Sequence, residues 1–490
     1  MVDPHVMGDS YSERDPSLSQ LFDAIERKLD EMLGAYSCSA GAPFDKQMDE
    51  IILRASGIWK KSGYLKNSFA RINRFPRELL GHIPTFLENE RDLINTTAVC
   101  RHWRTTLLAT PYLWCNISGS STSKIRAYLE RSRWRPLNVR LTSSNLARLL
   151  RPHIRRVASL RLDLVGQSHM DQVAVHLPEP APSLRTLSIR SRHVGHNLDI
   201  PPSFLGGSFP SLKEILAEDI SSFSGPPTFH SVTSFTLHTN SDISLDTASL
   251  LRTLERLPAL EILFIEFRSR GIPTTAAGDR IVTLQNLRTL SLLSTNDMGG
   301  ARMGPVLPGL YLPKLEKLDV HSHYTLESIG PCFPLSFSGL LPNFSELPKA
   351  VLVPRSWFTE IHLQNESQHT LDIFIGQLSS FEKTREVLGG LPLWSVRSLA
   401  IEVRDMDMEW LFGMLGALEG VEDLEIRGRW TQVLRFWRGS WKWKGLCPAL
   451  RRLVVYGGEG VEVDLAAFND ARQDVGLPLT ITHLVSNEGC

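Results

Sequence analysis

Two short pairs of side chains in this sequence are of types that can hold a metal ion. His321 and His323 alternate, so on a strand both imidazoles would point to one face, and imidazole is a common zinc ligand. Asp405 and Asp407 could offer carboxylate oxygens to a harder cation. However, no third His or Cys lies near the first pair, and the second pair stands at the start of a predicted helix that it can cap. The sequence therefore predicts no metal site.

The short motifs of the common catalytic sites are also missing. The sequence contains no GxxxxGK[ST], HExxH or GxSxG stretch. Its six cysteines are widely spread and form no CxxC pair, which indicates neither a disulfide framework nor a zinc site. We therefore predict a protein that is not an enzyme, that needs no cofactor, and that keeps its thiols reduced in the cytoplasm or the nucleus.

The overall charge gives no reason to expect a polyanionic partner. Lys and Arg together number 53, as do Asp and Glu, so the formal net charge is zero. Two stretches interleave basic and aromatic residues, 435–438 and 441–444, which could indicate RNA or membrane contact or, as we favour, packing with the cations reaching solvent. No apolar run approaches the roughly 20 residues that span a bilayer. We predict no nucleic-acid partner and no membrane partner.

The stretch from Phe75 to Trp114 has the signals of a small helical module. Pro76 suits the first turn of a short helix, which Pro84 ends or kinks. After a polar turn, a second helix is predicted from about Arg91 to Leu108. A module of roughly 40 residues buries too little surface to be stable by itself, so it should pack on neighbouring parts of the chain or on a partner.

The order of residues in this module resembles the F-box motif. The residues that carry the resemblance are Phe75, Pro76, Glu78, Leu79, Leu80, Ile83, Phe86, Leu87, Asp92, Leu93, Val99, Cys100, Arg101, Trp103, Arg104, Pro111, Leu113 and Trp114. Phe75 stands where the family usually has Leu, a like-for-like apolar change. The general plan, in which an N-terminal helix and a long repeat region flank the module, is similar to F-box proteins of fungi.

The resemblance implies a partner and a site. F-box proteins are substrate receptors that bind a Skp-type adaptor and, through it, a cullin-based ubiquitin ligase. On that basis the adaptor-binding residues are expected to be Pro76, Leu79, Leu80, Ile83, Leu93, Val99, Cys100 and Trp103. Exposed apolar side chains on a small helical unit are also typical of a protein interface. Some of the eight should serve as core, because so small a unit needs several to hold itself together.

Residues 1–70 form a separate N-terminal segment before the F-box, which we place at 71–116. An apolar stripe at helical spacing predicts a helix over about 18–33, and a second helix is predicted over about Lys46–Trp59. The first stripe could pack on the rest of the protein, or it could bind a partner helix or a second copy of the chain.

The rest of the chain, residues 135–490, repeats one six-residue pattern, apolar-x-x-apolar-x-apolar, mostly every 20 to 29 residues. This spacing is that of leucine-rich repeats, although the asparagine that often follows the strand is missing. The copies are Val157–Leu162, Leu184–Ile189, Leu212–Ala217, Val232–Leu237, Leu260–Ile265, Leu287–Leu292, Leu315–Val320, Phe358–Leu363, Val396–Ile401, Val421–Ile426 and Leu450–Val455. Leu137–Leu141 and Leu479–Leu484 could add a strand at either end.

The pattern predicts an α/β fold in which a short all-α F-box module precedes a leucine-rich-repeat-like solenoid with a parallel concave sheet. Each hexamer forms a short strand with one buried face, and helices such as Leu245–Leu257 and Met406–Leu418 return the chain. The regular spacing of the repeats is interrupted near 321–357, where a Pro-rich stretch indicates an insertion. This insertion could contribute to a binding surface, or it could have a purely structural role.

Residues that flank the last apolar position of each strand are expected on the concave face. The target-binding candidates are Arg161, Arg190, His238, Phe264, Glu266, Asp319, His362, Glu402, Arg427 and Tyr456. This mixed-sign polar surface suits a protein segment rather than nucleic acid.

Together these features predict the substrate-recognition subunit of an SCF-type ubiquitin ligase, whose repeats bind a target protein that the sequence does not identify. The alternative is a leucine-rich-repeat binding scaffold with no connection to a ligase. Binding of a Skp-type adaptor distinguishes the two.

Overall fold

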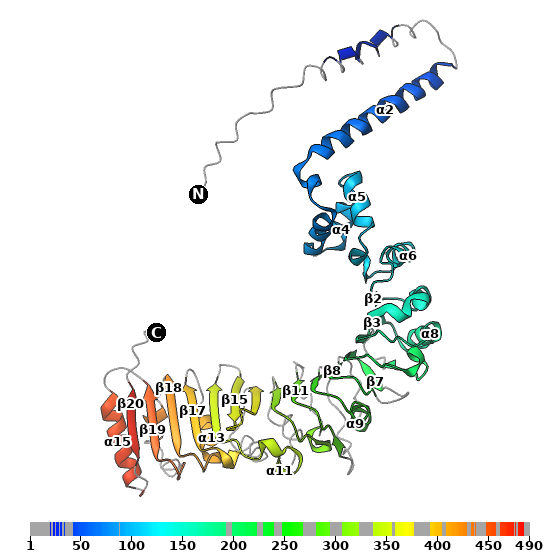
Figure 1. Cartoon of the computed structure of the whole chain (residues 1–490). Helices are drawn as coiled ribbons and strands as arrows, with labels where there is room; N and C mark the ends of the chain where they lie inside the picture. The colour runs from blue at the N-terminus through cyan, green and yellow to red at the C-terminus, as the bar shows by residue number, and fades with distance from the viewer. Residues whose placement is uncertain are drawn as a thin grey trace. The chain divides into compact units, whose positions relative to one another are not determined.

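The computed structural model in Figure 1 describes most of the chain from residue 43 onward. The described residues are scattered positions between 20 and 34, followed by 43–87, 89–192, 198–222, 229–239, 247–267, 281–294, 306–322, 337–354, 358–376, 393–403, 408–428, 433–435, 437, 447–456, 461–474, 476 and 479–484. The chain divides into two compact units, Met1–Leu113 and Trp114–Cys490. Half of the predicted helix at 18–33, including every residue of its apolar stripe, lies outside the described residues, and the described positions within it are helical.

The first unit, the helical unit, is built from one long helix followed by several short ones. In chain order these are α2 (Pro43–Phe69), η1 (Arg71–Arg74), α3 (Arg77–His82), η2 (Ile83–Phe86), α4 (Glu90–Thr96) and α5 (Arg101–Leu108). Pro84 lies at the start of η2, where it ends the α-helical turn of α3 as predicted. Few large apolar side chains of the described part are fully buried here, namely Leu80, Trp103, Leu107 and Leu113.

The predicted single helix over Arg91–Leu108 is wrong, because the structure breaks it into α4 and α5. The hydroxyls of Thr96 and Thr97 donate to the backbone carbonyls of Leu93 and Ile94, 2.6 and 2.7 Å away, at the end of α4. The backbone then extends at Cys100, which is the residue before α5. Threonine hydroxyls compete with the helical ladder in this way, and the periodicity of the apolar residues did not reveal it. By contrast, α2 runs ten residues beyond the predicted end at Trp59.

The second unit is dominated by one large sheet. Sixteen strands among the described residues pair in the order β1-β2-β3-β4-β6-β8-β9-β11-β13-β16-β15-β14-β17-β18-β19-β20. Their bounds are β1 Asn116–Ile117, β2 Leu137–Leu141, β3 Val157–Leu164, β4 Thr186–Ser191, β6 Glu214–Glu218, β8 Ser234–Thr239, β9 Ile262–Phe267, β11 Thr289–Ser294, β13 Lys317–Ser322, β14 Lys349–Pro354, β15 Phe358–Gln364, β16 Thr370–Gly376, β17 Ser398–Val403, β18 Asp423–Gly428, β19 Arg452–Tyr456 and β20 Thr480–Leu484. Two small pairs, β5 (Leu198–Asp199) with β7 (Ile220–Ser222) and β10 (Val282–Thr283) with β12 (Leu310–Tyr311), stand apart.

The register of the sheet explains why the hexamer pattern recurs. Leu290 lies beside Leu263 and Leu318, and Leu292 lies beside Ile265 and Val320, so the apolar residues form continuous buried rows. Side chains alternate between the two faces of a strand, so the residues between them line the opposite face. Full burial of one such side chain contributes about 1.5–3 kcal/mol, and every strand adds to the same rows.

The sheet is not wholly parallel, which corrects the predicted topology. β15 runs antiparallel to both its neighbours, β14 and β16, and these two are parallel to the strands outside them. The chain leaves β13, forms β14 at a distance, and returns through β15 to place β16 against β13. Phe358–Leu363 is thus the middle strand of a three-stranded meander and not a further copy of the repeat. An antiparallel strand shows the same alternation of apolar residues, so the pattern could not distinguish them.

Helices and 3-10 turns connect the parallel strands and cover the apolar rows. The α-helices are α6 (Thr122–Arg131), α7 (Ala147–Leu150), α8 (Gln167–His176), α9 (Thr247–Glu255), α11 (Phe337–Leu340), α13 (Met408–Ala417) and α15 (Val461–Gln473). The two predicted return helices are confirmed as α9 and α13.

Helices α8 and α9 lie on one side of the sheet (Figure 1), and α9 buries Leu250, Leu251 and Leu254. No described helix is long and apolar enough to span a membrane.

Candidate functional site

The helical unit exposes many of its large apolar side chains. Leu79 of α3 is 55% exposed, and Phe75, Phe86, Ile94 and Val99 are exposed as well. These residues come from separate turns and helices that the two breaks, at Pro84 and at Thr97–Cys100, bring onto one small unit. Several large apolar side chains exposed on one small unit are typical of an interaction site.

The eight predicted adaptor-binding residues divide into two groups. Pro76, Leu79 and Val99 are exposed, and Ile83, Leu93 and Cys100 are half-buried. Leu80 and Trp103 are buried, and the Trp103 Nε1–H donates to Asn73 Oδ1 at 2.7 Å. The buried pair therefore holds the unit together, while the other six side chains reach its surface.

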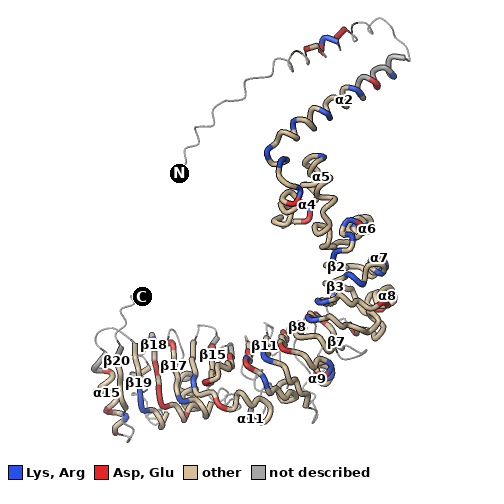
Figure 2. Tube along the Cα trace, viewed as in Figure 1, with Lys and Arg blue, Asp and Glu red and all other residues tan. Residues whose placement is uncertain are grey.

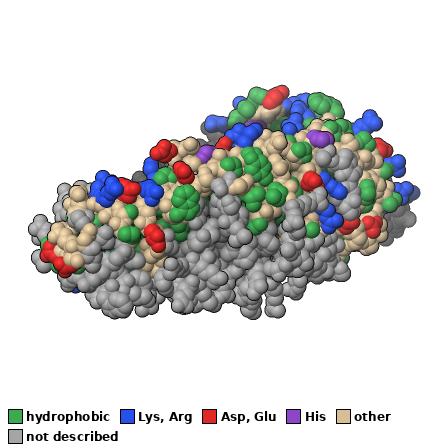
Figure 3. Space-filling model, turned by 90° about the horizontal axis from the view of Figure 1, so that it is seen from below, with side chains coloured by type: hydrophobic (Ala, Val, Ile, Leu, Met, Phe, Trp, Pro, Cys, Tyr) green, Lys and Arg blue, Asp and Glu red, His purple; other side chains and the backbone are tan. Residues whose placement is uncertain are grey.

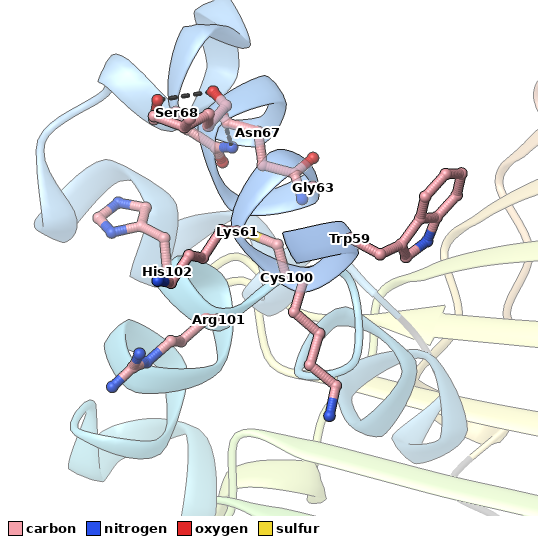
Figure 4. Close-up of a pocket in the computed structure, with 11 residues that line it drawn as sticks. Trp59, Lys61, Gly63, Asn67, Ser68, Cys100, Arg101 and His102 are labelled. Atoms are coloured by element: carbon pink, nitrogen blue, oxygen red, sulfur yellow. Dashed lines mark hydrogen bonds between the residues drawn. The ribbon is translucent and has the colours of Figure 1, made fainter. Parts of the chain in front are cut away.

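A hollow of about 890 Å³ lies between the C-terminal half of α2 and the start of α5 (Figure 4). Trp59, Lys61 and Leu65 line it from α2, and Cys100 and His102 line it from the other side. The hollow brings α2 and one of the predicted adaptor-binding residues, Cys100, to the same surface. This hollow was not predicted from the sequence, because the predicted helix ended at Trp59.

The ten predicted target-binding residues fall into two rows on the sheet. In the aligned register, Arg161, Phe264, Asp319 and His362 occupy the third position of their strands, while Arg190, His238, Glu266, Glu402, Arg427 and Tyr456 occupy the fifth. Both rows lie on the face opposite the buried leucines. We call this surface, formed by the first, third and fifth strand positions, the polar face.

Opposite charges pair between neighbouring strands of the polar face. Arg190 Nε lies 2.9 Å from Glu218 Oε2, His238 pairs with Glu266, and Lys317 Nζ lies 3.9 Å from Asp372 Oδ2. Cross-strand pairs of opposite charge each add a modest stabilisation. Glu266 is buried, so of the ten predicted residues it is the least accessible to a partner.

The charge along the polar face is not uniform. Arginines gather on β2, β3 and β4, whereas β17 and β18 carry Glu402, Asp423 and Glu425. Figure 2 shows the basic residues at β2 and β3 and acidic residues around β17 and β18. Lys, Arg, Asp and Glu side chains are also interspersed on the face of the molecule that Figure 3 presents. A ligand of one sign along its whole length would not match this surface.

The central strands hold a histidine between two carboxylates. His362 Nδ1 lies 2.7 Å from Asp372 Oδ1, and His362 Nε2 lies 3.3 Å from Glu360 Oε2. The hydrogen bond with Asp372 raises the pKa of His362 against the opposing effect of burial. Burial alone would raise the pKa of Asp372, but the hydrogen bond and charge of His362, together with Lys317, hold it below its usual value. The pair is therefore most charged at mildly acidic pH.

The other chemistry-bearing residues give no catalytic centre in the described part of the chain. His323, Asp405 and Asp407 lie outside the described residues, and no group of three or more metal-ligating side chains occurs among those described. Cys100, Cys115 and Cys447 are free thiols, and burial raises the pKa of Cys447 to about 12. A thiol with that pKa stays protonated near neutral pH and is a poor nucleophile.

Two residues of the basic and aromatic stretch at 435–438 are described, and both pack within the second unit, as favoured from the sequence. Trp437 is buried with its ring against those of Phe412 and Phe468, at centroid distances of 5.5 and 5.0 Å. Arg435 is exposed and pairs with Asp464 of α15. Residues 441–444 lie outside the described residues.

Several polar-face residues were not among the sequence-based candidates. Arg140, Arg192, Glu360 and Asp372 all take part in ion pairs with residues that were candidates or with their neighbours. The alternation within Leu137–Leu141 could have identified Arg140, because it places Arg140 on the same face as Arg161. Glu360 and Asp372 depended on the meander, which the pattern did not predict.

Comparison with known protein families gives one result for the helical region. Residues 72–119 match the family described as F-box-like. No curated protein matches the chain significantly. The matched range coincides with the helices from η1 to η3 (Pro111–Trp114) and includes all eight predicted adaptor-binding residues.

Proposed function

We propose that this chain is the substrate-recognition subunit of an SCF-type, cullin-based ubiquitin ligase. The observation that carries the proposal is the coincidence of the F-box-like match with the region of exposed apolar side chains. F-box domains bind Skp-type adaptors, so those side chains have a partner of known kind. The ligase connection then follows through the adaptor, and the setting is the cytoplasm or the nucleus.

Within this proposal, six residues contact the adaptor directly. They are the exposed or half-buried Pro76, Leu79, Ile83, Leu93, Val99 and Cys100. Leu80 and Trp103 act indirectly, because they are buried and keep the short helices in place. The few interface residues that contribute most to binding are typically apolar side chains that become fully desolvated, and Leu79 is the best placed.

The second unit serves as the target-binding part. We propose that its parallel strands and connecting helices form a leucine-rich-repeat-like solenoid, and that its polar face binds the target protein. Support comes from the 20-to-29-residue spacing and from the aligned rows of polar side chains. Pairs such as Arg190–Glu218 hold these side chains in place before a partner arrives, which lowers the entropy lost on binding.

The proposed mechanism needs no catalytic group in this chain. One unit holds the adaptor and the other holds the target, so the target's lysines are kept near an enzyme that carries activated ubiquitin. Tethering raises their effective concentration at that enzyme, as a linker does between two binding modules. The chain would thus contribute proximity and the choice of target.

The test is capture of the adaptor by the full-length chain, expressed with a tag in cells and analysed by mass spectrometry. Wild-type protein should recover a Skp-type adaptor and a cullin. Leu79→Asp should lose both, whereas Val351→Asp, a matched change at an exposed apolar residue of the sheet, should keep them. Absence of the adaptor from the wild-type sample would favour a binding scaffold without a ligase.

A further inference from the structure

Three arginines converge on one carboxylate at the N-terminal end of the polar face. Arg140 Nε donates to Asp163 Oδ2 at 2.6 Å, and Arg161 Nε donates to Asp163 Oδ1 at 3.2 Å. Arg192 Nη2 lies 3.8 Å from Asp163 Oδ2. The Asp163 side chain is 1% exposed, while the three arginine side chains remain 42–46% exposed. The buried carboxylate therefore holds the three guanidinium groups in place, while part of each arginine side chain remains exposed to solvent.

The positive charge of this cluster exceeds its negative charge. Arg190, on the strand next to Arg161, pairs with Glu218 of β6. Four guanidinium groups thus share two carboxylates, Asp163 and Glu218, in the described part of this region. Placing like charges side by side is unfavourable unless something compensates them. Two positive charges are still to be balanced by a ligand or by solvent ions.

We propose that Arg140, Arg161, Arg190 and Arg192, the arginine platform, bind an acidic segment of the target. This rests on the proposed function of the polar face. Guanidinium groups offer flat pairs of N–H donors that match carboxylate and phosphate oxygens. Burial alone would raise the pKa of Asp163, but the hydrogen bonds from Arg140 and Arg161 hold it below its usual value. The anchor therefore stays ionised at neutral pH, and the platform is formed in advance.

The width of the platform limits the ligand to a short acidic segment. The arginines lie on β2, β3 and β4, or directly after β4, and neighbouring strands are about 4.8 Å apart, so the cluster spans on the order of 10 Å. Beyond it, β6 presents Glu214 and Glu218, and β9 presents Glu266. A long polyanion such as a nucleic acid would meet these carboxylates. Two acidic residues match the excess positive charge, and an extended segment of about three residues matches the width of the cluster.

Binding of labelled peptides to the full-length chain tests the platform. Fluorescence anisotropy would compare three peptides that carry three consecutive Glu, Gln or phosphoserine residues in the same Gly/Ser context. We expect the Glu peptide to bind and its affinity to fall with added salt, whereas the Gln peptide does not bind. Tighter binding of the phosphoserine peptide would identify phosphate as the preferred anion, and equal binding would identify carboxylate.

Matched variants assign the binding to these residues. Arg161→Gln with Arg192→Gln should weaken binding of the Glu peptide at least tenfold, and Arg161→Lys with Arg192→Lys should restore part of it. Arg452→Gln, on the same face at the other end of the sheet, should have no effect. Binding of the Gln peptide as tightly as the Glu peptide, no binding of any peptide, or an equal loss in Arg452→Gln would overturn the proposal. Adaptor capture by the same variants shows separately whether the ligase assignment holds.

A second inference concerns helix α2 and rests on a different observation. Residues at alternating spacings of four and three follow a heptad pattern along α2: Phe44, Met48, Ile51, Ala55, Ile58, Ser62, Leu65 and Phe69. All are apolar except Ser62. Among those whose side chains the structure describes, Ile58, Leu65 and Phe69 are 50–69% exposed. A heptad pattern sustained over more than three repeats is typical of a coiled coil.

The charges of α2 indicate what covers this seam. Asp45, Asp49 and Glu50 lie near its start together with Lys46, whereas the charged residues further along, Arg54, Lys60, Lys61 and Lys66, are all basic. Figure 2 shows red only near the start of α2 and blue along the rest of the helix. In an antiparallel pair of identical helices, the acidic part of one copy meets the basic part of the other. If Ala55 of one copy packs against Ile58 of the other, Asp45 of one copy lies near Lys66 of the other. In the same register, Ile52 of one copy lies near Trp59 of the other. We infer that α2 pairs antiparallel with α2 of a second copy.

Sedimentation velocity of the full-length chain tests this inference with a charge reversal. Wild type should sediment as a dimer at micromolar concentration. Ile58→Asp with Leu65→Asp should give a monomer, while Leu53→Asp, off the seam and 73% exposed, should leave the dimer intact. Asp45→Lys and Lys66→Asp should each weaken dimerisation, and their combination should restore it. A monomeric wild type, or no restoration in the double variant, would contradict the antiparallel pairing.

Discussion

The two units of this protein place similar side chains in opposite surroundings. In the sheet unit, leucine, isoleucine and valine of successive strands stack into rows that are almost completely buried. In the helical unit, side chains of the same types project from the long helix α2 and from the short helices that follow it, and most of the large apolar side chains exposed in the described part of the chain lie there. Each strand is covered by its neighbours, whereas these helices leave much of their apolar surface uncovered.

This difference supports the proposed division of roles between the two units. The sheet completes its own apolar core and presents polar residues to the outside, which suits the proposed selection of a target by charge. The helical unit leaves large apolar side chains exposed, which suits the proposed contact with an adaptor. Changes to apolar residues should therefore act on stability in one unit and on binding in the other.

The strongest test of this division is Trp103→Ala, which should unfold the helical unit. Replacing a buried Trp by Ala typically costs about 3–5 kcal/mol, and few other large side chains support this unit. Hydrogen exchange of residues 72–113 should rise sharply, and adaptor binding should disappear with the fold. Trp103→Phe keeps a six-membered aromatic ring but removes the rest of the indole with its hydrogen bond to Asn73, so it should cost about 1 kcal/mol for the lost hydrogen bond and less in total than Trp103→Ala.

Leu290→Ala, in a buried row of the sheet, should lower the free energy of unfolding of the second unit by about 2–5 kcal/mol. Chemical denaturation followed by circular dichroism would measure the loss. Adaptor affinity should not change. A simultaneous loss of adaptor binding would show that the two units depend on each other.

Leu79→Asp should show the reverse pattern. Because Leu79 is exposed, the unfolding free energy should stay within about 0.5 kcal/mol of wild type. Adaptor affinity should fall by 2 kcal/mol or more, roughly 30-fold, because a charge would be buried in an apolar contact. A large drop in stability would instead make Leu79 a core residue.

Asp163→Asn should destabilise the sheet unit by about 1–3 kcal/mol, because the guanidinium groups around it lose their shared charged acceptor. The pKa of Asp163 is lowered in the folded state, so its contribution is present at neutral pH and is lost as pH falls below about 5 through the folded pKa. Urea unfolding at pH 7 and at pH 3 would show a wild-type advantage that shrinks in acid. An equal difference at both values would contradict the ionised anchor.

His362 should give the smallest effect, with the opposite pH dependence. Its pKa is raised in the folded state, so the stabilisation is fully present below the unfolded value of about 6.5 and is lost as pH rises through the folded pKa. The difference in melting temperature between wild type and His362→Gln should therefore be larger at pH 6 than at pH 8.5. A difference that grows with pH would exclude the charged pair with Asp372.

The sequence predicted the strands of the sheet well because their apolar spacing is regular and is needed for burial. Val157–Leu162 and Leu287–Leu292, for example, fall within or largely within β3 and β11. It did not predict that Phe358–Leu363 runs in the opposite direction, since direction depends on which strand edges meet and not on alternation. The end of the helix at Thr97 was also missed, because hydrogen bonds from threonine hydroxyls do not alter the apolar period.

The candidate surfaces were predicted to a similar extent. Alternation placed Arg161, Arg190 and His362 on the polar face, but their carboxylate partners Glu218 and Asp372 became evident only from the register. In the helical unit, the motif named Leu80 and Trp103 beside Leu79 without showing that only Leu79 is exposed. Burial of single residues in so small a unit depends on how its short helices turn, which spacing does not determine.

The central claim, that adaptor binding belongs to the helical unit alone, is tested most directly by calorimetric titration of a purified Skp-type adaptor into the full-length chain. The account predicts saturable one-to-one binding for wild type and Val351→Asp with the same affinity, and no detectable heat for Leu79→Asp. Failure of the wild-type chain to bind the adaptor, or an equal loss in Val351→Asp, would contradict it.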